Sequence, residues 1–424
     1  MTTPSAPLAS YSRAFRLNCP SHKVPRVEAL LQAEGFTFDT LPFYPLGRCL
    51  TDGPTALGNA LAHLFGYIYI QDRSSMLPPL LLDPPKGAVV LDICASPGSK
   101  TSLLARLVGP KGLVVANEPN PSRLATLRST LRTQNLVGVV TTCYPGQDLP
   151  LDEGNWPFIL LDAPCSGWGT VNKNPQVMKL WTQDKLVPLV RLQKKLLAKA
   201  VRLLAPGGVL VYSTCTTNPQ ENEEQIRWAV DTLGLELNHL DPLNGFTAHR
   251  HGSPELAHCL LVDGDTSRAQ DFFVARLTKP GNPGQSIVSQ DSAKGSNPLS
   301  LDLLTQEQPL REQTLQEGGC YLFNNRVFFL HHKALQLLPP SMRWQGMPLG
   351  TLRKNRFRID PVLYCLMPEY EVGGGLNVTD VSVLHNLLSG QSLPTSGTSR
   401  GLYWQGLPLG WLTRKGKRCL WSGR

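Results

Sequence analysis

Two cysteines and one aspartate lie in short motifs whose residue types suit attack on a pyrimidine ring. Asp162 and Cys165 belong to Asp-Ala-Pro-Cys-Ser-Gly (162–167), and Cys215 belongs to Tyr-Ser-Thr-Cys-Thr (212–216). A thiolate is a strong nucleophile and a good leaving group. Addition of a thiolate at carbon 6 of cytosine activates carbon 5 toward a methyl donor, and a nearby carboxyl group can stabilise the charge on ring nitrogen 3. A second thiol can then assist release.

Short apolar runs and helical segments alternate between Tyr67 and Lys279, which predicts an α/β fold. The expected architecture is a doubly wound, mostly parallel, Rossmann-like methyltransferase sheet. The expected strands are 88–93, 113–116, 137–142, 158–162 and 209–213, with 272–277 as a late edge strand. The expected helices are 99–107, 121–134 and 188–204. Since the carboxyl ends of parallel strands face one crevice, Asp162, Cys165 and Cys215 should meet there.

A small-residue turn follows the first of these strands and predicts a cofactor site. The turn comprises Cys94, Ala95, Ser96, Pro97, Gly98, Ser99 and Lys100. Small residues let a ligand approach the backbone closely, but both the G-x-G-x-x-G pattern and the P-loop pattern are absent. Glu118 ends the second strand and is a candidate ribose ligand. The alternatives are an ordinary tight turn and a surface carboxylate favoured by a helix N-terminus.

Composition divides the rest of the chain into smaller regions. We expect a small mixed N-terminal RNA-binding region (1–66), the methyltransferase domain (67–280), a linker (281–300) and a β-rich domain (301–424). The last region repeats Trp-Gln-Gly-Met-Pro-Leu-Gly (344–350) as Trp-Gln-Gly-Leu-Pro-Leu-Gly (404–410), which suggests two similar hairpins. It carries 14 Lys or Arg and 8 Asp or Glu, most of the excess that gives the chain its formal charge of +9. The basic balance favours a polyanionic partner.

Several classes of protein are disfavoured by the sequence. None of the ten cysteines forms a Cys-x-x-Cys pair, so we expect no metal site. The N-terminus lacks a Sec signal, and no apolar stretch approaches the roughly 20 residues that span a membrane. We therefore expect a cytoplasmic monomer with free thiols and no membrane contact.

At these motifs the sequence resembles the Sun/Fmu (Nop-type) family of RNA cytosine-5 methyltransferases. The resemblance covers roughly residues 67–279, including Leu-Leu-Ala-Pro-Gly-Gly (203–208) and Asn-Pro-Gln-Glu-Asn-Glu (218–223). The C-terminal region resembles, more weakly, the PUA-like domain of the bacterial ribosomal branch. This resemblance implies S-adenosyl-L-methionine as cofactor and RNA as substrate, with ribosomal RNA favoured over transfer RNA.

The resemblance also implies roles for individual residues. Cys215 would be the nucleophile, Cys165 would promote release, and Asp162 would contact both the target cytosine and the cofactor. Lys100 would line the cofactor and help to position the base, beside residues 94–99 and Glu118. One departure stands out: the family's usual acidic residue after the third strand is missing, and Tyr144, Pro145 or Asp148 would have to replace it.

Two other functions compete with this interpretation. A DNA cytosine-5 methyltransferase would use Cys165 as nucleophile and would leave the Ser-Thr-Cys motif without a role. A non-catalytic RNA-binding ribosome assembly factor would be expected to lose its thiols, yet both are present. The sequence therefore favours an RNA methyltransferase but does not name the target nucleotide.

Overall fold

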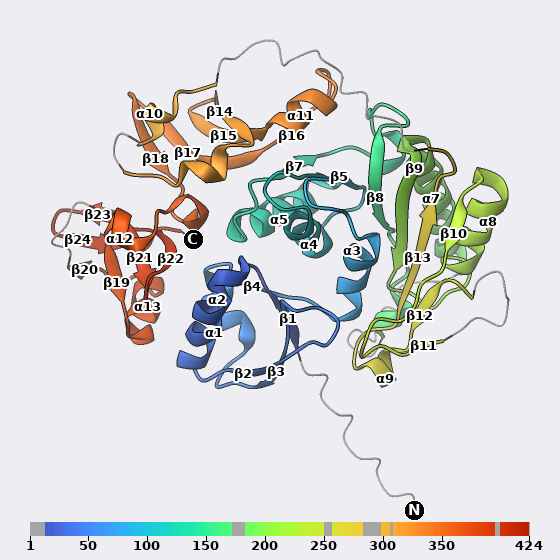
Figure 1. Cartoon of the computed structure of the whole chain (residues 1–424), viewed down its shortest axis with the longest axis horizontal. Helices are drawn as coiled ribbons and strands as arrows, with labels where there is room; N and C mark the ends of the chain where they lie inside the picture. The colour runs from blue at the N-terminus through green and yellow to red at the C-terminus, as the bar shows by residue number, and fades with distance from the viewer. Residues whose placement is uncertain are drawn as a thin grey trace, which may run out of the picture.

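A computed structural model describes residues 13–171, 183–249, 257–282, 298–305, 308–394 and 399–423 of the chain. Its centre is a ten-stranded sheet with the order β11-β12-β13-β9-β8-β5-β6-β7-β16, in which β10 also pairs with β13 (Figure 1). The parallel strands are β5 (Val89–Asp92), β6 (Leu113–Asn117), β7 (Val139–Thr142), β8 (Trp156–Asp162) and β9 (Leu204–Thr214). The doubly wound α/β fold predicted from the sequence is confirmed.

Helices cover both faces of this sheet because successive residues of each strand point to opposite sides. In β5, Val90 packs on one face and Leu91 on the other. The helices on the first face are α3 (Leu77–Leu82), α4 (Ser99–Val108) and α5 (Pro121–Thr133). Those on the second are α7 (Gln183–Leu203), α8 (Glu223–Leu233) and α11 (His332–Leu337).

The strand expected at the sheet edge lies inside the sheet instead. Its residues form β13 (Phe272–Thr278), which runs antiparallel between β9 and β12 (Leu260–Val262). Beyond it lies β11 (Ala248–His249), and β10 (Glu236–Asn238) also pairs with β13. At the opposite edge of the sheet, β16 (Trp344–Gln345) pairs with β7. The edge prediction is wrong because strands of two or three residues carry too little apolar pattern to be recognised in a sequence.

The N-terminal segment forms a separate four-stranded sheet of order β2-β3-β1-β4 beside helix α1 (Val24–Ala33) (Figure 1). Its strands are β1 (Ala14–Leu17), β2 (Thr37–Thr40), β3 (Gly47–Asp52) and β4 (Ile68–Ile70). The small helix α2 (Leu61–Leu64) precedes β4.

The C-terminal region holds three small sheets (Figure 1). The first comprises β14 (Gly318–Phe323), β15 (Arg326–His331), β17 (Met347–Arg353) and β18 (Arg356–Ile359). The second comprises β19 (Leu376–Val378), β21 (Gly401–Trp404) and β22 (Leu407–Trp411), beside helix α13 (Val381–Leu388). The third comprises β20 (Leu393–Pro394), β23 (Thr413–Lys415) and β24 (Arg418–Leu420).

One hydrophobic core joins the N-terminal and C-terminal regions, although the chain separates them by the whole central sheet. The rings of Tyr67 and Tyr364 stack with centroids 4.3 Å apart, and the hydroxyl of Tyr67 donates to the carbonyl of Pro408. Arg132 of α5 forms a two-pronged ion pair with Asp360, at 2.5 and 2.6 Å. The N-terminal and C-terminal regions therefore pack against each other, and Arg132 links the C-terminal region to helix α5 of the central sheet.

The described residues contain no helix that is both long and apolar enough to cross a membrane.

Candidate active site

The two cysteine motifs follow neighbouring parallel strands. Asp162, the last residue of β8, pairs in register with Ser213 of β9. The turns that follow bring the sulfur atoms of Cys165 and Cys215 to 3.0 Å, and the amide of Cys215 donates to Cys165 Sγ at 3.3 Å. Both thiols are free and partly accessible. The crevice that the strand pattern predicts therefore contains both sulfur atoms in direct contact.

The hydrogen bond between the thiols makes them chemically unequal. Donation from Cys165 lowers the pKa of Cys215, and the positive charge of Lys100 acts in the same direction, against burial and Asp162. The same hydrogen bond, together with burial, raises the pKa of Cys165. Since the thiolate is the nucleophilic form, the lowered pKa makes Cys215 the more reactive of the two sulfur atoms.

Asp162 is held by two donors at the mouth of the same crevice. Lys100 Nζ donates to one carboxylate oxygen at 2.7 Å, and Ser213 Oγ donates to the other at 2.7 Å. Burial acts to lower the pKa of Lys100, but the charge and hydrogen bond of Asp162, with Cys215 and Asp92, together outweigh burial, and the net pKa is raised. The crevice thus presents an ammonium and a carboxylate as a fixed pair.

A buried carboxylate, Glu221, clamps the two cysteine turns together. It accepts hydrogen bonds from the backbone N–H of Ser166 at 2.9 Å, the hydroxyl of Ser166 at 2.5 Å and the side-chain amide of Gln193 at 2.9 Å. Ser166 Oγ also lies 2.8 Å from Thr216 Oγ1. Glu221 is fully buried, and Ser166, the residue after Cys165, donates two hydrogen bonds to it. Because the hydroxyl of Ser166 also contacts Thr216, the residue after Cys215, the same cluster connects the two cysteine turns.

The turn after β5 has the shape of a ligand cradle. Gly98 adopts φ +103°, and a Cβ atom there would lie 2.9 Å from Leu127 Cδ1, so α5 packs directly on the turn. Helix α4 begins at the next residue, Ser99, and the first N–H groups of a helix lack partners within it. Lys100 extends from this turn to Asp162, which links the cradle to the thiols.

Two carboxylates lie at the adjacent strand ends and supply acceptors for a ligand. Burial raises the pKa of Asp92 to about 7, and its Oδ1 has no hydrogen-bond partner among the described residues. Glu118 follows β6 and accepts from the backbone N–H of Asn120 at 2.9 Å. A donor-rich ligand with ribose hydroxyls and an ammonium group fits this set of acceptors.

Tyr144 is held at both ends in the turn after β7. Its backbone N–H donates to the side chain of Asn117 at 3.0 Å, and its hydroxyl accepts from the backbone N–H of Arg343 at 2.8 Å. Pro145 and Asp148 nearby are exposed. Replacement of the missing acidic residue by Tyr144, Pro145 or Asp148 stays a prediction.

The chain matches a family model described as 16S rRNA methyltransferase RsmB/F over residues 79–278. Two curated relatives are each named ribosomal RNA small subunit methyltransferase F. The one from Shewanella sp. (strain ANA-3) is 30% identical and covers 96% of this chain and 89% of its own. The one from Shewanella amazonensis is 31% identical and covers 82% and 76%.

The chain belongs to the RsmB/F family. It is an S-adenosylmethionine-dependent RNA cytosine-5 methyltransferase, as the sequence motifs predict. A solved structure titled as a methyltransferase homolog from Pyrococcus horikoshii is 35% identical, with a TM-score of 0.56, and covers 65% of this chain and 87% of that one. A structure of NSun6 from the same organism, 21% identical with a TM-score of 0.55, supports the fold.

The sequence predicted the residues of this RsmB/F site whose side chains meet in the crevice. It did not predict the residues that hold the two cysteine turns in place. Asp162, Cys165, Cys215 and Lys100 converge as expected. The clamp residues Glu221 and Gln193 received no role, although Glu221 belongs to a motif that the sequence singled out. The sequence signal for Glu221 is its position between Gln220 and Asn222, just before helix α8. Such a run of polar side chains is unusual in a segment that becomes buried.

Proposed function

We propose that this protein methylates carbon 5 of a cytosine in small-subunit ribosomal RNA through a covalent adduct on Cys215. The substrate part follows the description of the matched family and the names of the relatives. The mechanistic part rests on one observation: the two thiols lie 3.0 Å apart, with the pKa of Cys215 lowered and that of Cys165 raised.

The residues at the start of the reaction activate the base. The Cys215 thiolate forms a bond to carbon 6 of the cytosine, and the ring electrons move toward nitrogen 3 and carbon 5. Lys100 is a donor for the nitrogen or oxygen on which charge grows, and Asp162 is an acceptor for the amino group of cytosine. Turn residues 94–100 and Glu118 would hold S-adenosylmethionine, which supplies an electrophilic methyl group when bound.

Release requires the second thiol. A base removes the proton from carbon 5, the freed electron pair restores the double bond between carbons 5 and 6, and the bond from carbon 6 to sulfur breaks. Cys165 assists by donating its proton toward the departing sulfur of Cys215, which lies 3.0 Å from its own sulfur. The target base must be unpaired or flipped to reach this crevice.

The test is to trap the adduct on a denaturing gel with radiolabelled small-subunit RNA and S-adenosylmethionine. Cys165→Ala should accumulate protein covalently attached to RNA, whereas Cys215→Ala and the double variant should form none. Adduct on Cys215→Ala but not on Cys165→Ala would reverse the roles. Bisulfite sequencing of the RNA then identifies the methylated cytosine, and methylation of transfer RNA alone would overturn the proposed substrate.

The same proposal includes binding of the RNA phosphates by the basic C-terminal region. Cations bind phosphates whatever the base sequence, so this region would add affinity but no sequence selectivity. The expectations of a monomer and of a cytoplasmic location stay predictions.

A further inference from the structure

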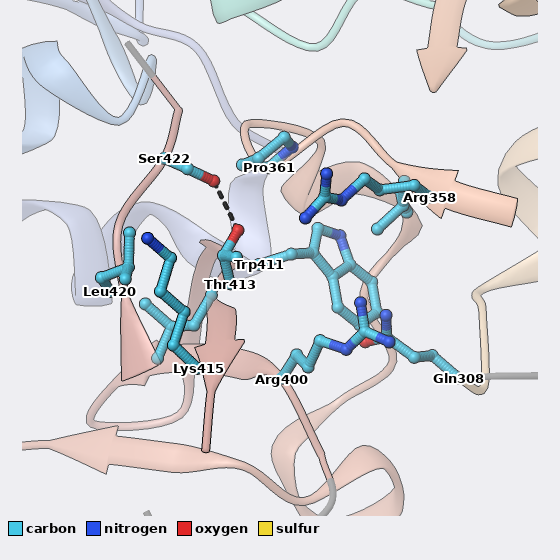
Figure 2. A pocket seen from close by; sticks show the side chains of 11 residues that line it. Gln308, Arg358, Pro361, Arg400, Trp411, Thr413, Lys415, Leu420 and Ser422 are labelled. Carbon is cyan, nitrogen blue, oxygen red and sulfur yellow. Dashed lines mark hydrogen bonds between the residues drawn. The ribbon is translucent and has the colours of Figure 1, made fainter. Parts of the chain in front are cut away.

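A pocket lies in the C-terminal region, among residues that the proposed chemistry does not use. It has a volume of about 410 Å³ and lies among β18, β22, β23 and β24 (Figure 2). Its lining includes three cations, Arg358, Arg400 and Lys415, and none of the described lining residues is a carboxylate. The volume falls within the range of small-molecule sites, which is about 300–1,000 Å³.

Two of these cations are exposed and lack an ion-pair partner in the part of the chain that the structure describes. They are Arg358 and Lys415. Asp360, two residues after Arg358, is occupied by Arg132. The rim therefore offers positive charge to an anion from solution.

The interior of the pocket offers a different kind of contact. Gln308 is only 8% exposed, and its Oε1 has no hydrogen-bond partner among the described residues. A buried hydrogen-bond acceptor without a partner is unfavourable. A ligand with an N–H group would therefore gain binding free energy by donating to Gln308 Oε1. Sulfate, by contrast, brings no hydrogen-bond donor at neutral pH.

The floor of the pocket is apolar and rigid. Trp411 is buried, its indole N–H donates to the carbonyl of Leu363 at 2.9 Å, and its backbone N–H donates to Pro361 at 2.8 Å. Figure 2 shows Gln308, Arg358 and Arg400 around the same hollow as this ring. A flat apolar group fits against such a floor.

We propose that this pocket binds one unpaired nucleotide of the RNA substrate, outside the catalytic crevice. The base would lie on the apolar floor and donate to Gln308, and the adjacent phosphates would pair with Arg358 and Lys415. Because Asp360 beside the pocket is ion-paired to Arg132 of α5, the bound nucleotide lies at a fixed place relative to the catalytic sheet. The proposal rests on RNA as the substrate.

The test measures binding of a fluorescent 12-nucleotide single-stranded RNA to the full chain by anisotropy, over a series of salt concentrations. Gln308→Leu should weaken binding about fivefold or more without changing the salt dependence, because it removes an uncharged contact. Arg358→Gln should also weaken binding and should lower the slope of log affinity against log salt by about one. Melting temperatures check that each variant is folded, and Arg358→Gln, an exposed position, remains informative if Gln308→Leu does not fold.

Lys417→Gln is the matched control, since Lys417 is exposed on the same hairpin as Lys415 but does not line the pocket. If the pocket variants lose no more RNA affinity than this control, the pocket contributes only general surface charge and the proposal is overturned. The proposal is also overturned if an acidic peptide displaces the labelled RNA as strongly as unlabelled RNA does, or if both pocket variants bind RNA as tightly as the unchanged protein.

Adduct trapping separates the two proposals. If Cys165→Ala traps RNA but the pocket variants bind normally, only the pocket proposal fails. If no RNA is trapped or methylated by any form of the protein, the proposed function itself fails.

Discussion

The catalytic crevice and the C-terminal pocket handle polar groups in opposite ways. In the crevice, Asp162 and Glu221 each accept two or more hydrogen bonds, and the pKa values of the thiols are shifted by their contact. In the pocket, Arg358 and Lys415 are exposed, and Gln308 Oε1 has no partner among the described residues. Chemistry needs groups fixed before the substrate arrives, whereas a binding site can leave its groups for the ligand to satisfy.

The largest difference between the two regions should appear when Cys215 is changed. Cys215→Ser should lower methylation at saturating RNA by at least about 1,000-fold, because removal of a nucleophile removes the covalent route. Methyl transfer from radiolabelled S-adenosylmethionine gives the rate. Arg358→Gln in the same assay should retain its maximal rate, and a comparable loss there would erase the contrast.

Glu221→Gln should give the next largest effect. The amide presents N–H groups where the carboxylate accepted from Ser166 and Gln193, so the two cysteine turns shift. A displacement near 1 Å costs about 100-fold in rate, and we expect kcat to fall roughly 10- to 100-fold with little change in KM.

Exposed Glu224→Gln, on the helix that follows, is the control for Glu221→Gln. Equal folding of the two proteins, measured by circular dichroism, is required. A rise in KM with constant kcat would show that Glu221 supports RNA binding instead of positioning the thiols.

The pH dependence of alkylation should reveal the unequal thiols. The hydrogen bond from Cys165 lowers the pKa of Cys215, so Cys165→Ala should raise that pKa and move the midpoint of Cys215 alkylation to higher pH. Lys100→Met should move it in the same direction, since a positive charge is lost. Mass spectrometry after brief iodoacetamide treatment measures each cysteine separately, and a midpoint that moves to lower pH contradicts the proposed hydrogen bond.

The smallest effect should come from Arg132→Gln, which breaks the link between the two regions. Arg132 is about one third exposed, so the ion pair with Asp360 should contribute only about 1 kcal/mol. The melting temperature should fall by only about 1 °C, because the entropy of unfolding scales with chain length. Methylation at saturating RNA should be unchanged while RNA affinity falls, and equal affinity would show that the pocket acts independently of the catalytic sheet.

The two Trp-Gln-Gly copies show the limit of local sequence. In the second copy, Trp404 and Leu407 flank a tight turn at Gln405 and Gly406, with φ of +46° and +77°, and form a hairpin. In the first copy, Trp344 and Gln345 leave the local sheet and pair with β7 of the catalytic sheet. The expectation of two similar hairpins is therefore correct only in part. The Pro-Leu-Gly residues of both copies lie in antiparallel hairpins, β17–β18 and β21–β22, but only the second copy turns at its Gln-Gly.

The sequence by itself determined the parallel strands of the central sheet and the motifs at their ends, which bring Asp162, Cys165, Cys215 and Lys100 together. These features depend on local periodicity and on motifs of a few residues. Only the tertiary structure decided that the two sulfur atoms touch, that the pKa of Cys215 and not that of Cys165 is lowered, and that Glu221 holds both turns. The same holds for the pocket around Gln308. These features depend on distances between residues far apart in the chain, and on burial that no single segment specifies.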